Sequence, residues 1–161
     1  MKIVINVRFL IKDQLEGIGV FTNETLSRLT KKHPEHQFYF VFDRKAHPDF
    51  SFSGNIIPVV ALPPARHPLL WCIWFQISLK FVLRRIKPDI FVSMDGFLPL
   101  ASKIKKLAVI HDIAFEHYPK DIPFSVRKYY LHYFPKFAKK ADRIATVSEY
   151  SKNDIIFTYH T

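Results

Sequence analysis

The residues best suited to chemistry in this 161-residue sequence are His111 and Asp112, which follow the apolar run 107–110. Two of the four residues in that run are β-branched, which predicts a buried strand ending at the His-Asp pair. In open α/β sheets ligands bind outside the carboxyl ends of the strands, so titratable residues at this point predict a functional site. The alternatives are a structural histidine and a carboxylate that caps the following turn.

Two of the chain's four glycines, Gly17 and Gly19, lie between the first predicted strand and the first predicted helix. Glycine lets the backbone approach a phosphate closely, and a helix N-terminus favours the negative charge. The pattern is not a full dinucleotide-binding fingerprint, because Thr22 stands at the third glycine position and the loop after the strand is too long. Glycines that simply turn the chain are an equally good interpretation.

A third group of polar residues begins the last predicted helix. Ser148 suits an N-cap, and Ser151 with Asp154 fits the spacing of a capping box. The simplest interpretation is that these residues start a helix. Their functional interest is that a second helix N-terminus would open at the same edge of the sheet as His111.

These residues need a scaffold of alternating strands and helices. Strands are predicted at 3–7, 37–42, 56–62, 89–94, 106–110 and 143–147, and helices at 20–33, 69–86, 123–140 and 148–159, with a loop at 113–122. Pro58 places the third strand at or near a sheet edge. The alternation predicts an α/β fold: a doubly wound, Rossmann-like parallel sheet of about six strands, with helices on both faces.

The composition limits the classes of protein. A length of 161 residues fits one domain, and 48% hydrophobic residues exclude disorder. The single cysteine, Cys72, excludes a disulfide within the chain and a thiolate zinc cluster. His33 and His36 flank Pro34 and are expected to be separate surface residues, so no metal site is predicted. No signal peptide or bilayer-spanning run is apparent, which favours a cytoplasmic protein.

The charge predicts an anionic partner. Lys and Arg number 24 against 14 Asp and Glu, a net charge of +10. Six of these net charges fall within 101–143, where helix 123–140 also carries several aromatic residues: Tyr129, Tyr130, Tyr133, Phe134 and Phe137. Basic residues beside aromatic ones can form a membrane-surface face, although a solvated face opposite an aromatic core face fits as well. No nucleic-acid motif is present, so lipid is the preferred anionic surface.

Four motifs, in order, make the chain resemble a known family. They are Arg8 with the Gly17-Ile18-Gly19 loop, Lys87-Pro88-Asp89, Val109-Ile110-His111-Asp112, and the run from Ala141 to Ile155. Over essentially its whole length the chain resembles the N-terminal half of a GT-B glycosyltransferase of family 4, the mannosyltransferase-like group of polysaccharide and lipopolysaccharide synthesis. The resemblance implies sugar transfer from a nucleotide-sugar donor, with retention of configuration, in a cleft between two Rossmann-like domains. It implies no metal and no other cofactor.

The resemblance also implies roles for individual residues. His111 would be the catalytic residue, with a hydrogen bond to the donor sugar near the reacting carbon. The other residues would bind substrate or support it: the backbone of Gly17 and Gly19 at the donor diphosphate, Ser148 and Glu149 on the cleft floor, Arg8 where the family often has an arginine, and Asp112 beneath His111 or its loop.

By this resemblance residues 1–161 are a single acceptor-side domain, and the donor-binding C-terminal domain is expected to be absent from the sequence. Such a domain should fold without transferring sugar. Its expected partners are the nucleotide-sugar donor, a glycan or lipid-linked acceptor and the anionic inner face of the cytoplasmic membrane, but not nucleic acid. Exposure of the inter-domain face is expected to favour self-association.

Two alternatives remain from the sequence. The first is a basic domain that binds an anionic membrane surface without catalysis, since the net charge alone supports it. The second is a generic nucleotide-binding Rossmann domain. Against a nicotinamide cofactor, the strand 37–42 offers only Asp43 as an acidic residue for the ribose.

Overall fold

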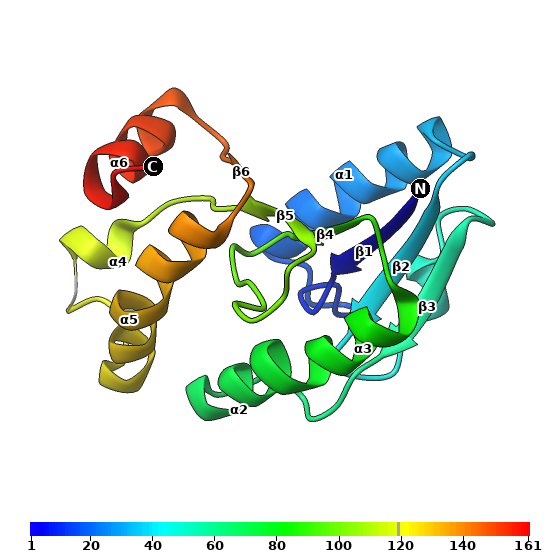
Figure 1. Ribbon diagram of the computed structural model, residues 1–161, viewed down its shortest axis with the longest axis horizontal. Coiled ribbons are helices and arrows are strands. Elements are labelled where there is room, and N and C mark those ends of the chain that lie inside the picture. The colour runs from blue at the N-terminus through cyan, green and yellow to red at the C-terminus, as the bar shows by residue number, and fades with distance from the viewer. Residues whose placement is uncertain (119) are drawn as a thin grey trace.

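A computed structural model describes residues 1–118 and 120–161 as a six-stranded, all-parallel sheet with helices packed against it (Figure 1). The strands are β1 (Lys2–Asn6), β2 (Gln37–Phe42), β3 (Ile56–Val60), β4 (Ile90–Ser93), β5 (Lys105–Val109) and β6 (Arg143–Ala145). Their order in the sheet is β3-β2-β1-β4-β5-β6. This confirms the predicted Rossmann-like, doubly wound α/β fold.

The strand order creates one point where the winding reverses. The chain runs outward from β1 through β2 to β3, then returns to place β4 on the other side of β1. The register pairs Asn6 with Ser93, so the carboxyl ends of these two strands lie side by side. A crevice outside such a reversal point is where open α/β sheets bind ligands. Pro58 lies in β3, at the sheet edge, as predicted.

Helices cover both faces of the sheet, as predicted (Figure 1). They are α1 (Ile18–Lys32), the 3₁₀ turn η1 (Pro48–Phe50), α2 (Pro68–Ile73), the π-helical turn η2 (Trp74–Ser78), α3 (Leu79–Ile86), α4 (Ala114–His117), α5 (Phe124–Lys140) and α6 (Glu149–Tyr159). Leu26 of α1 belongs to one apolar core, while α2, η2, α3 and α5 contribute to a second core on the opposite face.

Several predicted boundaries are wrong for local reasons. The first helix begins at Ile18 and not at 20, which brings Gly19 into its first turn. The predicted loop 113–122 contains the short helix α4. The predicted helix 69–86 is confirmed as one continuous helical segment over 68–86, but its middle turn, η2, is π-helical, and Trp74 and Phe75 are fully buried there. The alternation of strands and helices is also incomplete, because residues 94–104 join β4 to β5 through turns and not through a helix.

The aromatic run 129–137 of α5 packs in the core and does not form a membrane-facing surface. Tyr129, Phe134 and Phe137 are buried in the second core. Burial raises the pKa of Tyr129 far above its ordinary value, which keeps its hydroxyl neutral. The structure therefore favours the core interpretation of this aromatic run over the membrane-surface interpretation.

Phe97, in the segment after β4, lies at the centre of this aromatic core. Its ring stacks on Phe75 of η2 at a centroid distance of 5.0 Å and on Tyr129 of α5 at 5.6 Å. The Phe134 ring packs edge-to-face with the Phe97 ring at a centroid distance of 5.4 Å. Offset stacking and edge-to-face contacts of this kind add to the hydrophobic gain of burial. One residue outside any helix or strand therefore joins two separate helical segments over the sheet.

Replacing Phe97 with alanine should lower the free energy of unfolding by about 3–5 kcal/mol, because the cavity left behind is surrounded by rings that cannot collapse into it. Urea unfolding followed by circular dichroism measures the loss. Phe157→Ala is the matched control, since Phe157 on α6 is 82% exposed and should lose less than about 0.5 kcal/mol. Equal losses in the two variants would contradict the central position of Phe97.

Candidate functional site

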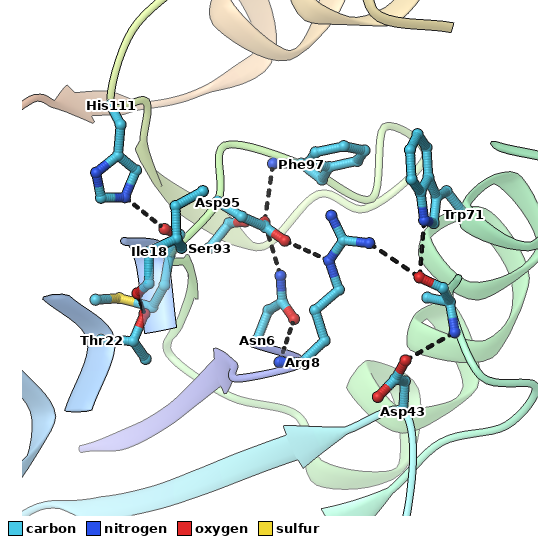
Figure 2. Close-up of polar contacts among 12 residues, drawn as sticks. Asn6, Arg8, Ile18, Thr22, Asp43, Trp71, Ser93, Asp95, Phe97 and His111 are labelled. Carbon is cyan, nitrogen blue, oxygen red and sulfur yellow. Dashed lines mark hydrogen bonds and ion pairs between the residues drawn. The ribbon is translucent and has the colours of Figure 1, made fainter. Parts of the chain in front are cut away.

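A buried ion pair lies where the winding of the sheet reverses. Arg8 follows β1 and Asp95 follows β4, so the adjacent strands bring the two side chains together (Figure 2). Arg8 Nε donates to Asp95 Oδ2 at 2.5 Å, and the two side chains are only 5% and 1% exposed. A second Arg8 nitrogen donates to the carbonyl oxygen of Ala65 at 3.2 Å. The pair therefore ties three separate segments together at the strand ends.

Other polar groups complete the environment of Asp95. Its Oδ1 accepts hydrogen bonds from Asn6 Nδ2 at 2.8 Å, from Ser93 Oγ at 2.7 Å and from the Phe97 amide at 3.3 Å. The Asn6 side-chain oxygen accepts in turn from the Arg8 amide at 3.2 Å. A buried charge is tolerated only when its partners satisfy it in this way. We conclude that this network fixes how the ends of β1 and β4 sit against each other.

The Arg8 guanidinium is also enclosed by aromatic rings. Its central carbon lies 4.5 Å from the Phe97 ring centroid and 4.7 Å from that of Phe9. Trp71 and Phe75 follow at 5.4 Å each. A planar guanidinium suits such surroundings better than an ammonium group, because it is weakly hydrated and stacks on aromatic faces. The site therefore couples the polar network to the aromatic core beneath it.

His111 follows β5 and is held by the neighbouring segment. Its Nε2 lies 3.0 Å from the carbonyl oxygen of Met94. The dashed line from His111 in Figure 2 marks this contact. A carbonyl oxygen can only accept, so Nε2 must carry the hydrogen, and Nδ1 of the neutral ring is then an acceptor. The Phe21 ring, from the first turn of α1, packs edge-to-face with the imidazole, with the two ring centroids 4.9 Å apart. The half-buried imidazole is thus oriented from two sides and keeps one acceptor nitrogen.

The two glycines of the first loop have different surroundings. Gly17 is exposed and adopts a φ of +34°, in the region that favours glycine, and a Cβ there would meet no atom within 4 Å. Gly19 is buried, and its amide already donates to the carbonyl oxygen of Glu16 at 2.6 Å. A Cβ on Gly19 would lie 2.7 Å from the Phe9 carbonyl oxygen. Gly17 is therefore the open position, and Gly19 allows α1 to pack against the loop.

The remaining predicted site residues make local structural contacts. Asp112 Oδ1 accepts from the Ala114 amide at 3.0 Å, which is the turn-capping alternative. Ser148 is the N-cap of α6 and accepts from the Ser151 amide at 3.0 Å. Glu149 is exposed and pairs with Lys152 at 3.0 Å. These contacts explain the local folds, and none of them concerns a ligand.

The predicted residues fall into two groups in space. Arg8, Gly17 and His111 lie around the carboxyl ends of β1, β4 and β5. Ser148 and Glu149 line a separate hollow of about 700 Å³ beside β6. The groups are linked through Thr146, whose hydroxyl donates to the His111 carbonyl oxygen at 3.3 Å.

Two adjoining hollows lie beside Gly17 and Arg8, and His111 is not among the residues that line them. One, of about 500 Å³, includes Gly17, and the other, of about 640 Å³, includes Arg8, Arg66 and Trp71. They share the lining residues Phe9, Ile11 and Gln14. Tyr130 also lines the larger hollow, and burial raises its pKa, so its hydroxyl stays neutral. The larger hollow therefore combines guanidinium groups with aromatic rings.

Asp43, the acidic residue at the end of β2, is fully buried and already engaged. Its carboxylate accepts from Arg44 Nε at 2.6 Å and from the Ala65 amide at 2.8 Å. A ribose-binding carboxylate of a dinucleotide site must have an oxygen directed at the ligand. The arrangement therefore argues further against the nicotinamide alternative.

The expected placement of two histidines needs correction. Among the described residues, His33, Glu35 and His36 place their ligand atoms within 4.8 Å of one another, although the sequence predicted separate surface histidines. A reverse turn after α1 stacks the two imidazole rings with centroids 5.6 Å apart. Hydrogen bonds from its own backbone and from His33 lower the pKa of Glu35. The group precedes β2, at the opposite edge of the sheet from His111.

The sequence prediction missed the polar network around Asp95. In the sequence, Asp95-Gly96 has the pattern of a turn and Asn6 is a single polar residue in an apolar run, so neither predicts a network. The sequence does show that the first and fourth strands both end in a polar residue, Asn6 and Ser93. The structure shows that both of these residues are buried. That pattern became meaningful only once the strand order placed those ends together.

The chain matches the family model described as Glycosyltransferase Family 4 over residues 15–161. No curated protein matches the chain. Across the described residues, every helix is too short or too polar to span a lipid bilayer.

Replacing Asp95 with asparagine should lower the free energy of unfolding by about 3–5 kcal/mol, because the Arg8 charge stays buried without its counter-ion. Adding Arg8→Met should recover part of that loss, since the unpaired charge is then removed. Asp13→Asn is the control, because Asp13 is exposed and its ion pair contributes less than about 1 kcal/mol. Denaturant unfolding of the parent chain, Asp95→Asn, Arg8→Met, the double variant and Asp13→Asn measures the effect, and additive losses at positions 8 and 95 would contradict the coupling.

Gly19→Ala should destabilise the chain by about 1–3 kcal/mol, because the new methyl group would press against the Phe9 carbonyl. Gly54→Ala is the matched control: a Cβ there meets no atom within 4 Å, so we expect no loss of stability. Thermal unfolding of both variants tests this. A Gly19→Ala protein as stable as Gly54→Ala would show that close packing does not require the glycine.

Proposed function

Because the chain belongs to glycosyltransferase family 4, we propose that residues 1–161 form the acceptor-side domain of a GT-B enzyme. This enzyme moves a sugar from a nucleotide-sugar donor to a glycan or lipid-linked acceptor, with retention of anomeric configuration. Family membership supports the glycosyltransferase activity itself. The donor class, the acceptor class and the stereochemistry are our proposal.

The observation that carries the proposal is the grouping of Arg8, Gly17 and His111 at the reversal point of the sheet. Arg8 follows β1, Gly17 precedes α1 and His111 follows β5. Arg8 and His111 are connected through the segment Met94-Asp95, and Phe21 of α1 packs against His111. Hollows of about 500 and 640 Å³ adjoin Gly17 and Arg8, respectively. This is the edge at which an open α/β sheet binds its ligand.

We assign roles from the chemistry of each group. The exposed backbone at Gly17 and the N-terminus of the 15-residue helix α1 would face the donor diphosphate, whose charge the helix dipole stabilises. His111 Nδ1 would accept a hydrogen bond from a hydroxyl of the donor sugar. In the transfer, the bond from the anomeric carbon to the diphosphate oxygen breaks and a bond to the acceptor oxygen forms. The acceptor's hydroxyl proton leaves with the departing phosphate.

The larger hollow suits the acceptor. Trp71 and Tyr130 offer aromatic surfaces on which sugar rings pack, while Arg66 offers positive charge to a phosphate of a lipid-linked glycan. Arg8 would act from beneath as a positioning residue, since its guanidinium is committed to Asp95 and Ala65. Asp112 would hold the His111 loop, and Ser148 with Glu149 would extend the floor of the cleft towards β6.

We propose further that this edge faces a second, donor-binding domain, which supplies most contacts to the nucleotide. Neither a metal nor another cofactor is part of the proposal, and nucleic acid is not a proposed partner. The proposed location is the cytoplasm, at the inner face of the membrane where lipid-linked acceptors are available. Without the opposing domain the same edge would remain open to self-association.

The test uses an enzyme in which residues 1–161 are joined to a donor-binding domain, with residues 1–161 alone as a baseline without transfer. His111→Ala should lower kcat/KM by about 10- to 100-fold, the cost of one lost hydrogen bond to substrate. His132→Ala is the control, because His132 is exposed on α5. Release of nucleoside diphosphate measures the rate, and the anomeric proton coupling of the product reports the stereochemistry.

Three outcomes would contradict the proposal. Full activity of His111→Ala would remove His111 from the site. A product of inverted configuration would exclude retention. Transfer by residues 1–161 alone would show that the second domain is not needed.

A further inference from the structure

An exposed apolar strip runs along the helical segment from α2 through η2 to α3. Leu69, Ile77 and Phe81 lie at multiples of four residues on this segment, and all three side chains are more than half exposed. Residues with this spacing share one side of a helix. The opposite side of the same segment carries Trp74 and Leu79, which are fully buried in the core. The strip is therefore the outward face of a helix whose other face is already packed.

The edge strand β3 extends this surface. Ile57 and Val60 are exposed, and together with Phe81 and Arg85 they line a shallow hollow of about 530 Å³ between β3 and α3. Leu62, also exposed, is held against the helix because Ser78 Oγ donates to its carbonyl oxygen at 2.5 Å. Monomeric proteins rarely leave a large contiguous apolar area open to water. We call the surface made by Ile57, Val60, Leu62, Leu69, Ile77 and Phe81 the β3–α3 face.

The charges around the β3–α3 face all have one sign. Between Asp49 and Asp89 the sequence has no acidic residue, but it has five basic ones: Arg66, Lys80, Arg84, Arg85 and Lys87. The last four lie in or directly after α3, beside Phe81. Within the part of the chain that the structure describes, none of the five makes a salt bridge. The face thus presents apolar side chains beside basic residues of α3, with Arg85 in the lining of its hollow.

We propose that the β3–α3 face binds an anionic lipid bilayer, with the α2–α3 segment lying in the plane of the interface. A strongly amphipathic helix with Phe and Leu on one face and Lys and Arg beside it inserts its apolar side chains among the lipids. The basic side chains then reach acidic head groups. A second copy of the chain is a poorer occupant, because two faces of the same positive charge repel each other. An RNA or DNA backbone would leave the apolar side chains without a partner.

The position of this face suits the proposed reaction but does not depend on it. Leu69 lies in the first turn of α2, three residues after Arg66, which lines the larger hollow at the carboxyl edge. A lipid-linked acceptor held in the bilayer would therefore have its head group near that hollow. Binding to vesicles can be measured without any sugar transfer, so failure of one proposal would not imply failure of the other.

The experiment is co-sedimentation of the 161-residue chain with vesicles of phosphatidylcholine, with or without phosphatidylglycerol. We expect binding only to the vesicles that contain phosphatidylglycerol, and weaker binding as salt is added. The double variant Ile77→Ser/Phe81→Ser should reduce the partition coefficient by about tenfold or more, because two apolar side chains no longer insert. The matched control Ile156→Ser/Phe157→Ser removes the same two residue types from exposed positions on α6 and should bind like the parent chain.

Charge is tested with a second matched pair. Arg84→Gln/Arg85→Gln should weaken binding more than Lys139→Gln/Lys140→Gln, which removes the same charge from the exposed end of α5. Circular dichroism and the melting temperature of every variant exclude unfolding as the cause. Equal binding of the parent chain to neutral and anionic vesicles would overturn the proposal. It would also be overturned if the variants of the β3–α3 face lost no more binding than their controls on α6 and α5. A dimer in sedimentation velocity that Ile77→Ser/Phe81→Ser dissociates would overturn it as well, since a second copy would then be the occupant.

Discussion

The buried ion pair between Arg8 and Asp95 is the constraint on which the rest of this structure depends. Two nearly unexposed charges must satisfy each other, and in doing so they fix the ends of β1 and β4, the strands between which the sheet reverses. Asn6 and Ser93 complete the shell of Asp95, and aromatic rings enclose the guanidinium of Arg8. A buried pair adds little net stability compared with apolar packing, but it penalises every arrangement that separates the charges. The pair therefore specifies one geometry for the edge.

That geometry determines how the functional groups are presented. Met94 lies between Ser93 and Asp95 in the sequence, so its carbonyl oxygen is fixed by the same network and in turn orients His111. Gly19 allows α1 to approach closely, and Phe21 then closes the other side of the imidazole. The surroundings divide the labour: His111 keeps one acceptor nitrogen and Gly17 is exposed, while Gly19, Asp112 and Ser148 hold the elements in place.

The sheet could be predicted from the sequence because it depends on local patterns: apolar β-branched runs gave six strands, and Pro58 identified an edge. His111 could be predicted because it follows such a run. The network around Asp95 could not, because it joins residues nearly 90 positions apart and depends on the strand order. Phe97 was missed because an apolar residue in an irregular segment shows no periodicity. The grouping of His33 with His36 was missed because the local turn, and not helix geometry, brings them together.

The most direct measurement is the ¹⁵N-resolved NMR spectrum of the His111 imidazole in the parent chain and in Asp95→Asn. If the ion pair orients His111 through Met94, the parent spectrum will show a solvent-protected proton on Nε2 and an unprotonated Nδ1 at a pH where the ring is neutral. In Asp95→Asn that proton will exchange rapidly with water. A proton on Nδ1 in the parent chain, or an imidazole spectrum unchanged by the substitution, would contradict the account.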